Sequence, residues 1–312
     1  MAFKIDNLYA NMSELNWYKG DLHIHSKASD GKNSKEEILE RLVQCNFNFA
    51  ALADHDIYCP GEDRKGLLII GNSELSTRGG DVLGLFAEAK PKSRETQDVI
   101  NAISSAGGLP VLAHPKIGEF TDEKTHWTYS SERLIKELSG YIGIEIYTHN
   151  VASGFQTAID RLDAVWTYGS RNNLKPSIWG FSGSDAHSIE KILPDVGIMA
   201  AAKELTTTAI YEAICKGKFY SIAGSTARFK EISAENEILT LVVEDAKVLY
   251  LFGTPQKNIS GNRRLLDIVW ADRKSHIKHS YRIKGTEGYI RAEAMDKCGN
   301  YAYINPLLLN ET

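Results

Sequence analysis

The sequence is poor in cysteine and has no long apolar run, and each absence excludes a class of protein. No cysteine belongs to a C-x-x-C pair, so we expect neither a thiolate zinc site nor a disulfide framework. No stretch approaches the ~18 apolar residues that span a bilayer, and the first residues lack the apolar core of a signal peptide. These absences predict a cytoplasmic protein. The four cysteines are Cys45, Cys59, Cys215 and Cys298.

Runs of like charge are also missing. The formal net charge is −4, and no basic run or basic amphipathic stretch occurs. Both observations argue against nucleic acid or an anionic membrane surface as a partner. Any site for an anion must therefore be local. Internal repeats and low-complexity tracts are absent too, which excludes a solenoid.

What the sequence contains is an ordinary globular composition, with 43% hydrophobic and 24% charged residues among 312. Up to about residue 222, short apolar runs alternate with helical patterns, which predicts a βα-type domain. Strands are expected at residues 20–25, 47–53, 67–71, 82–86, 109–113, 142–147, 178–182 and 219–222. Helices are expected at residues 34–45, 96–106, 131–139, 155–169 and 207–217.

From about residue 228 the pattern changes to polar–apolar alternation with tight turns, which is typical of antiparallel strands. We therefore predict two domains. An α/β domain is expected at residues 1–226, and a small all-β sandwich of a size that can fold alone at residues 227–312.

The stretch GDLHIHSKASDG, residues 20–31, places two histidines one residue apart in an expected strand. Side chains alternate between the two faces of a strand, so His23 and His25 point to the same face. That arrangement suits a metal site. Nine histidines in 312 residues produce roughly 0.26 such pairs by chance, so the pair needs support from the rest of the chain.

Support comes from the ends of other expected strands, where side chains able to bind a metal recur. They are Asp54, His55 and Asp56 after 47–53, Glu74 after 67–71, His114 after 109–113, His149 after 142–147, and Asp185 and His187 after 178–182. The carboxyl ends of the strands of a parallel barrel lie on one face, so we expect these groups to converge with His23 and His25.

The chemistry of this set limits the metal. Imidazole and carboxylate ligands suit zinc, manganese, iron or magnesium and exclude sites that need sulfur. The set also holds more donors than one tetrahedral ion can use, so two or three divalent ions are expected, with Glu74 bridging two of them. Such ions share a hydroxide and hold the oxygens of a phosphoryl group, which predicts hydrolysis through a metal-bridging hydroxide.

Five motifs now stand in one order: DLHIHSKASDG, ALADHD, Glu74 in NSELS, AHP and GSDAH. In this order they resemble the PHP (polymerase and histidinol phosphatase) metallohydrolases over about residues 20–224. The resemblance implies a distorted (β/α)7 barrel at residues 1–226, a di- or trinuclear metal centre and a phosphoesterase that hydrolyses a small soluble ester.

The resemblance also implies how the ligands are shared among ions. His23, His25, Glu74 and Asp185 are similar to the ligands of one ion, and Asp30, His55 and His187 to those of a second. Glu74, His114 and His149 are similar to those of a third.

The C-terminal stretch YIRAEAMDKCGNYAYINPLLL resembles the β-sandwich of a PHP subgroup that includes carbamate hydrolases. A carbamate, an amide or another carbonyl ester therefore stays open as an alternative substrate, because the same hydroxide attacks carbon as well as phosphorus. A third alternative is a non-catalytic protein that keeps the metal site and binds a partner through the sandwich.

Several positions have an alternative structural interpretation. Asp30 could cap the turn at Gly31, and His149 could be a loop histidine without a role. One of the two acids beside His55 could orient its ring, and Asp56 could instead line the pocket. Asp81 could belong to the pocket or to a turn.

The groups that would act on a phosphate ester are predicted as follows. His187 or Asp56 could protonate the leaving alcohol. Lys116, just after AHP, is the first candidate for binding the phosphate, followed by Arg78, Arg133 and Arg228. The remaining histidines, for which no role is predicted, are His126, His276 and His279.

Overall fold

The structure is a computed structural model, and it describes residues 3–64, 66–114, 130–149, 155–172, 174, 177–255 and 262–311. Two residues considered above, Lys116 and His126, lie outside the described residues. None of the helices in the described ranges is both long and apolar enough to cross a membrane.

The largest sheet has twelve strands and runs through both halves of the chain. Its main path is β1 (Phe3–Asp6), β20 (Leu307–Glu311), β18 (Tyr289–Met295), β19 (Tyr301–Ile304), β12 (Phe219–Ala223), β11 (Val196–Ala202), β2 (Asn16–Ile24), β3 (Phe49–Leu52), β5 (Leu67–Ile69) and β4 (Glu62–Arg64). Off this path, β15 (Val248–Gly253) pairs with β18 and with β16 (Arg264–Trp270). The first strand of the chain, β1, pairs with the last, β20, in antiparallel register.

A second sheet has five strands, in the order β10 (Trp179–Ser182), β9 (Gly143–Tyr147), β8 (Leu109–Leu112), β7 (Val82–Leu85) and β6 (Glu74–Leu75). β8, β9 and β10 are parallel, whereas β7 is antiparallel to both of its neighbours. The carboxyl ends of β8, β9 and β10 therefore lie at one edge, as the sequence predicts for parallel strands.

Among the described residues, two isolated bridges connect these sheets or the segments beside them, one between Ile24 and Ala186 and one between His55 and Glu74. The hydroxyl of Ser221 on β12 also donates to the carbonyl of Gly180 on β10. Each bridge joins a single pair of residues, and Ala186 and His55 lie outside the named strands, so neither bridge extends into a ladder. The described strands close no barrel, so the predicted (β/α)7 barrel is not confirmed. The mixed α/β architecture with a sheet-rich C-terminal region is confirmed.

Five α-helices accompany the sheets in the described part of the chain. They are α1 (Lys35–Gln44), α2 (Thr96–Ser105), α3 (Ser131–Lys136), α4 (Phe155–Arg171) and α5 (Thr207–Cys215). α1 begins with a capping box, in which Ser34 Oγ accepts from the amide of Glu37 and the Glu37 carboxylate accepts from the amide of Ser34. Short 3-10 turns at Met12–Glu14 and Ile189–Lys191 complete the helical elements.

The C-terminal strands form two layers. A three-stranded sheet of β13 (Arg228–Glu235), β14 (Ile238–Glu244) and β17 (Ile277–Arg282) shares one buried apolar cluster with β15, to which Leu241 and Leu251 belong. The large sheet crosses the predicted domain boundary, because β12 pairs with β19. The division at residue 226 stays a prediction.

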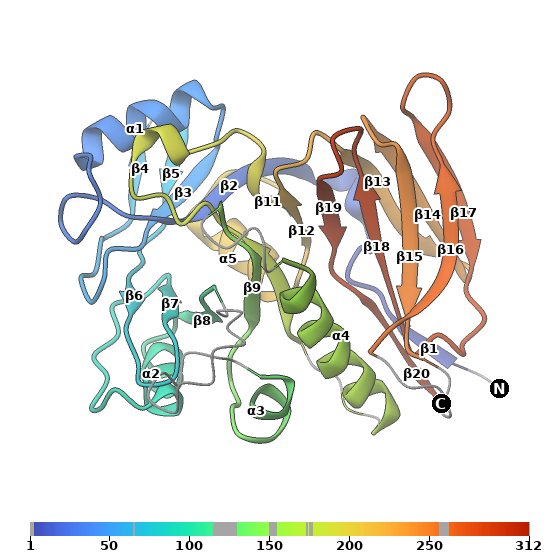
Figure 1. Cartoon of the computed structure of the whole chain (residues 1–312), viewed down its shortest axis with the longest axis horizontal. Helices are drawn as coiled ribbons and strands as arrows, with labels where there is room; N and C mark the ends of the chain where they lie inside the picture. The colour runs from blue at the N-terminus through green and yellow to red at the C-terminus, as the bar shows by residue number, and fades with distance from the viewer. Residues whose placement is uncertain are drawn as a thin grey trace.

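Helix α4 lies between the five-stranded sheet and the C-terminal strands (Figure 1) and contacts β9, β18 and β20. A fully buried ion pair ties it to β18. Nε and an Nη of Arg291 lie 2.7 and 2.6 Å from the two carboxylate oxygens of Asp163, and the hydroxyl of Tyr289 donates to the same carboxylate. Two charges removed from water must be paired in this way, so the contact specifies how α4 sits on the sheet.

Candidate metal centre

The two histidines of the His-x-His motif lie at the carboxyl end of β2, and both are buried. Nε2 of His23 and Nε2 of His25 are 3.1 Å apart, so the two rings face the same small space, as the alternation of side chains in the strand predicts.

Glu74 lies at the middle of the cluster, on the two-residue strand β6, and is fully buried. Its Oε1 is 2.8 Å from Nε2 of His114. Its Oε2 is 3.2 Å from Nε2 of His23, 3.3 Å from Nε2 of His25 and 3.3 Å from Nδ1 of His55. Burial raises the pKa of Glu74, whereas the charge of His23 and the hydrogen bond from His114 lower it. The lowering is the larger effect, so the pKa of Glu74 is well below its usual value. One ionised carboxylate thus faces four imidazoles.

Asp185 follows β10 and points into the same space. Its Oδ1 is 3.2 Å from Nε2 of His25 and 3.5 Å from Nε2 of His23. Its backbone φ of 50° lies in the left-handed region, which is uncommon for residues other than glycine but which Asp adopts more often than most. Burial raises the pKa of Asp185, and the charge of His23 together with the hydrogen bond from His25 lowers it more, so this carboxylate is ionised as well.

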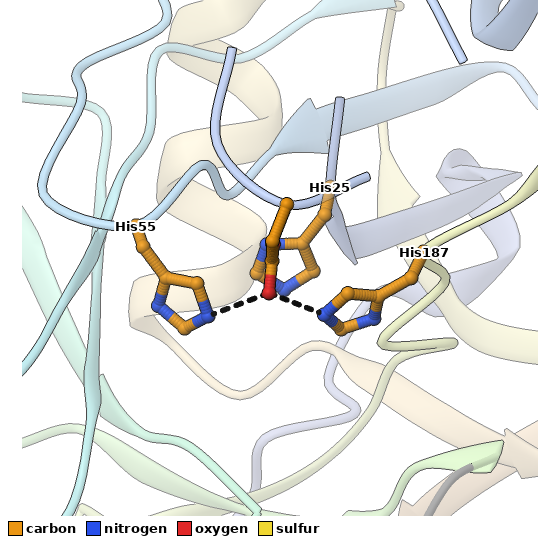
Figure 2. A group of neighbouring side chains, drawn as sticks. His25, His55 and His187 are labelled. Carbon is orange, nitrogen blue, oxygen red and sulfur yellow. Dashed lines mark hydrogen bonds and ion pairs between the residues drawn. The ribbon is translucent and has the colours of Figure 1, made fainter. Parts of the chain in front are cut away.

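A more exposed group of side chains adjoins His25. Figure 2 shows the rings of His25, His55 and His187 converging. Oδ2 of Asp30 is 3.2 Å from Nε2 of His187 and 3.7 Å from Nε2 of His55, and Oδ1 of Asp30 is 3.4 Å from Nδ1 of His25. Asp30 is 51% exposed and the rings of His55 and His187 are 34% exposed, so this side of the cluster is open to solvent.

Three groups of side chains are able to hold a cation, because the donor atoms inside each group all lie within 4.8 Å of one another. They are His25, Asp30, His55 and His187; His23, His25 and Asp185; and His23, Glu74 and His114. The close approach of His23 Nε2, His25 Nε2 and Glu74 Oε2 fits a divalent ion, because a shared cation satisfies all three donor atoms at once, whereas a proton satisfies two. The structure therefore brings the predicted ligands together, apart from His149. Their assignment to three separate ions stays a prediction.

His149 belongs to none of these three groups in the described residues. Its backbone amide donates to the carbonyl of Ser184, and its Nε2 is 3.2 Å from Nζ of Lys191. The assignment of His149 to a third ion stays a prediction.

The two acids beside His55 have different partners. Asp54 accepts from the backbone amide and the hydroxyl of Ser26 and from the hydroxyl of Ser29, so it holds the loop that carries Asp30. Asp56 has a φ of 55° and accepts from the amide of Ser76, and its Oδ2 is 2.9 Å from an Nη of Arg94. The catalytic role predicted for Asp56 stays a prediction.

The predicted phosphate-binding arginines are engaged with other parts of the protein. Arg78 pairs with Glu95, Arg228 pairs with Asp195, and Arg133 donates to the carbonyl of Gly79. Arg94, which was not among the predicted phosphate-binding residues, contacts Asp56 beside the cluster.

Asp81 belongs to the surroundings of the cluster. Its side chain is buried. Burial and then the nearby charge of Glu74 raise the pKa of Asp81, which agrees with the pocket alternative rather than with an exposed turn. In the C-terminal region, Nε2 of His279 is 3.0 Å from the carboxylate of Asp267, so this histidine has a structural partner.

Two buried acids behind the donor atoms were not identified from the sequence. Asp21 Oδ1 accepts from the amides of His23 and Ser184, and burial raises the pKa of Asp21 to about 6. The carboxylate of Glu145, on β9, lies within 3.1 Å of Nδ1 of His23 and accepts from the amide of His114. The signal for Glu145 in the sequence is a carboxylate in the middle of an apolar strand, IGIEIY.

Comparisons with known proteins place this geometry in context. No model of a known protein family matches the chain. An uncharacterized protein of Methanocaldococcus jannaschii, MJ1587, is 30% identical over 115 residues, which are 31% of this chain and 67% of that protein. The chain belongs to the same family as this protein, whose name states no activity.

A 5′-3′ exoribonuclease of Haemophilus influenzae is 36% identical over 85 residues, which are 24% of this chain and 31% of the exoribonuclease. Among solved structures, the chain is similar to a two-domain protein of Bacteroides vulgatus described as containing a predicted PHP-like metal-dependent phosphoesterase. That similarity covers 96% of this chain and 97% of the other, at 18% identity and a TM-score of 0.49.

Proposed function

We propose that the protein is a metal-dependent phosphoesterase of the PHP type that hydrolyses a small phosphate ester. The observation that carries the proposal is the position of Glu74, whose two oxygens face four histidines drawn from three separate segments. The matched H. influenzae protein supports a phosphorus centre, because its name describes cleavage of RNA, a phosphodiester.

Divalent ions would supply a Lewis acid for phosphoryl oxygens and would lower the pKa of an attacking water into the physiological range. His23, His25, Glu74 and Asp185 would hold one ion. Asp30, His55 and His187 would hold a second, and Glu74 and His114 would contribute to a third. Zinc, manganese and iron suit this mixed imidazole and carboxylate set, and magnesium suits its carboxylate oxygens.

The exposed side of the cluster is where a substrate would approach. His187 is one third exposed, so its ring could donate a proton to a leaving alcohol oxygen in a state in which it does not hold the second ion, and Asp56 is the alternative donor. Arg94, paired with the carboxylate next to His55, offers planar N–H donors to an anionic group of the substrate. The deeply buried His23 and Glu74 stay away from solvent and keep the donor atoms in place.

The test is hydrolysis of a panel with added Mn²⁺ or Zn²⁺. The panel holds phosphate monoesters, cyclic nucleotides, a short RNA, a carbamate and an amide. We expect turnover of a small phosphate ester, its loss with a chelator, and its loss in Glu74→Gln and in the double variant His25→Ala, His187→Ala. His276→Gln, a histidine in the C-terminal region, is the matched control and keeps wild-type activity.

Cleavage of the carbamate or amide alone would replace the phosphoesterase assignment by the carbonyl alternative. Preference for the RNA over every small ester would overturn the small-molecule substrate. A wild-type protein that binds no metal and turns over no member of the panel would favour the non-catalytic alternative.

A further inference from the structure

Glu145 joins two parts of the donor cluster from behind. It lies on β9 and is 2% exposed. Its Oε1 and Oε2 are 3.0 and 3.1 Å from Nδ1 of His23, on β2, and its Oε2 also accepts from the amide of His114, 2.8 Å away, after β8. One buried carboxylate therefore touches residues that come from two other strands in two different sheets.

The contact with His23 determines which ring nitrogen is available. A carboxylate accepts hydrogen bonds, so Nδ1 of His23 carries the proton in this contact and Nε2 points the other way. Nε2 is the atom that faces Glu74 at 3.2 Å and Asp185 at 3.5 Å. Glu145 contacts His114 through the backbone amide of His114. This hydrogen bond fixes the backbone of the residue whose Nε2 lies 2.8 Å from Oε1 of Glu74.

The surroundings leave this carboxylate little room to move. A Cβ on Gly183 would lie 2.8 Å from Oε1 of Glu145 and 2.9 Å from Cβ of His23. Glycine at this position of the motif GSDAH thus allows the close approach of the two side chains. Because the contact is also nearly excluded from water, a carboxylate there forms a stronger hydrogen bond than it would on the surface.

We propose that Glu145 is a positioning residue that aims Nε2 of His23 and the segment of His114 at the metal site from behind. The proposal rests on the metal-dependent function proposed above. Loss of such an outer partner of a ligating histidine typically weakens metal binding by about 10- to 100-fold.

The first experiment compares Mn²⁺ binding by calorimetry in wild type, Glu145→Gln and Glu145→Asp. Gln keeps the size of the side chain but offers an amide that can donate to Nδ1 and so permits the other tautomer. We expect Glu145→Gln to bind Mn²⁺ about 10- to 100-fold more weakly, and Glu145→Asp to recover part of the loss. Glu287→Gln is the matched control, because Glu287 is also buried but bonds to Tyr281 in the C-terminal region, and its Mn²⁺ affinity should equal that of wild type.

The second experiment needs neither a metal nor a stable variant. In the metal-free wild-type protein, ¹H–¹⁵N spectra of the histidine rings should show a slowly exchanging Nδ1–H proton for His23. A rapidly exchanging proton, or its absence, would overturn the proposal. Equal Mn²⁺ affinity in wild type and Glu145→Gln would overturn it as well.

The two experiments separate this proposal from the proposed function. If wild type binds no divalent ion and hydrolyses nothing, the function fails, whereas the protected Nδ1–H of His23 still supports the contact on which the positioning role depends. If wild type binds Mn²⁺ and Glu145→Gln does so equally well, only the positioning role fails.

Discussion

Nε2 of His114 and Oε1 of Glu74 lie 2.8 Å apart, although 40 positions separate the two residues in the sequence. The contact joins the end of β8 to the short strand β6, and both side chains are almost completely removed from water. Oε2 of the same carboxylate faces three further imidazoles. Glu74 therefore connects all parts of the donor cluster.

Replacing Glu74 by Gln should abolish metal binding. The change removes the negative charge that faces four rings while it keeps the size of the side chain. We expect a loss of Mn²⁺ affinity of more than about 100-fold, beyond the 10- to 100-fold that outer partners typically contribute. Elemental analysis after dialysis against Mn²⁺ checks this, and metal retained in the variant at the wild-type ratio would contradict it.

The stability of the metal-free protein should fall as the pH rises from about 6.5 to about 9. Burial lowers the pKa of His114, but the hydrogen bond to Glu74 and its charge raise it more, to about 9. A histidine whose folded pKa exceeds its unfolded value near 6.5 contributes stability that is complete below pH 6.5 and is lost as the pH rises through 9. The contribution is on the order of 3 kcal/mol.

Urea unfolding in the presence of a chelator at pH 6.5, 8 and 9.5 measures this dependence. His114→Gln should make the profile less steep in that window, while the raised pKa of His23 keeps a remaining slope, and His276→Gln should leave the profile unchanged. A variant at His114 with the same slope as wild type would show that another group causes the dependence.

Asp54→Ala should weaken the exposed side of the cluster more than the buried side. Asp54 accepts three hydrogen bonds from Ser26 and Ser29, in the loop that leads to Asp30. Without them Asp30 loses its fixed position beside His55 and His187. We expect the affinity of the exposed site for its metal ion to fall by about 10- to 100-fold, so that this site is empty at micromolar metal. The tighter binding events should persist in the same titration. Uniform weakening of all binding events would contradict this division.

Arg291→Met should destabilise the fold by about 3–5 kcal/mol. It removes the two-point partner of the buried Asp163, which keeps Tyr289 and, at 3.4 Å, Arg263. It also removes a partner of the buried Glu293. Adding Asp163→Leu to this variant should restore part of the loss, since a buried ion pair can be replaced by apolar groups of similar volume. Denaturant unfolding measures both. If the single variant lost less than about 1 kcal/mol of unfolding free energy, as is typical of an exposed ion pair, the result would contradict this prediction.

Most of the local structure follows from local sequence. The expected strands 20–25, 109–113 and 178–182 overlap β2, β8 and β10, because apolar runs bounded by turn residues are a local signal. The helix expected at 34–45 begins with the predicted capping box at Ser34. The short strands β4 and β6 are not among the expected elements, since very short strands leave no periodicity to detect. The seven-residue strand β11 is also not among them, because its continuous apolar run, VGIMAAA, has no alternation that distinguishes a strand from a buried helix.

That the donor residues lie close together follows from two general rules of strand geometry. Histidines at alternate positions of a strand share a face, and acids that follow parallel strands lie at one edge, so both rules hold even though no barrel closes. Closure of a barrel needs continuous hydrogen-bonded ladders between neighbouring strands. Between His55 and Glu74 the described structure has an isolated bridge instead of a ladder.

The sequence by itself determined which side chains could bind a metal and which faces of their strands carry them, because both properties depend on residue type and on the two-residue repeat of a strand. Only the tertiary structure decided that Glu145 stands behind His23, that His149 lies beside Lys191, and that the first strand pairs with the last. These contacts join residues far apart along the chain, and their geometry depends on how the sheets are placed in space.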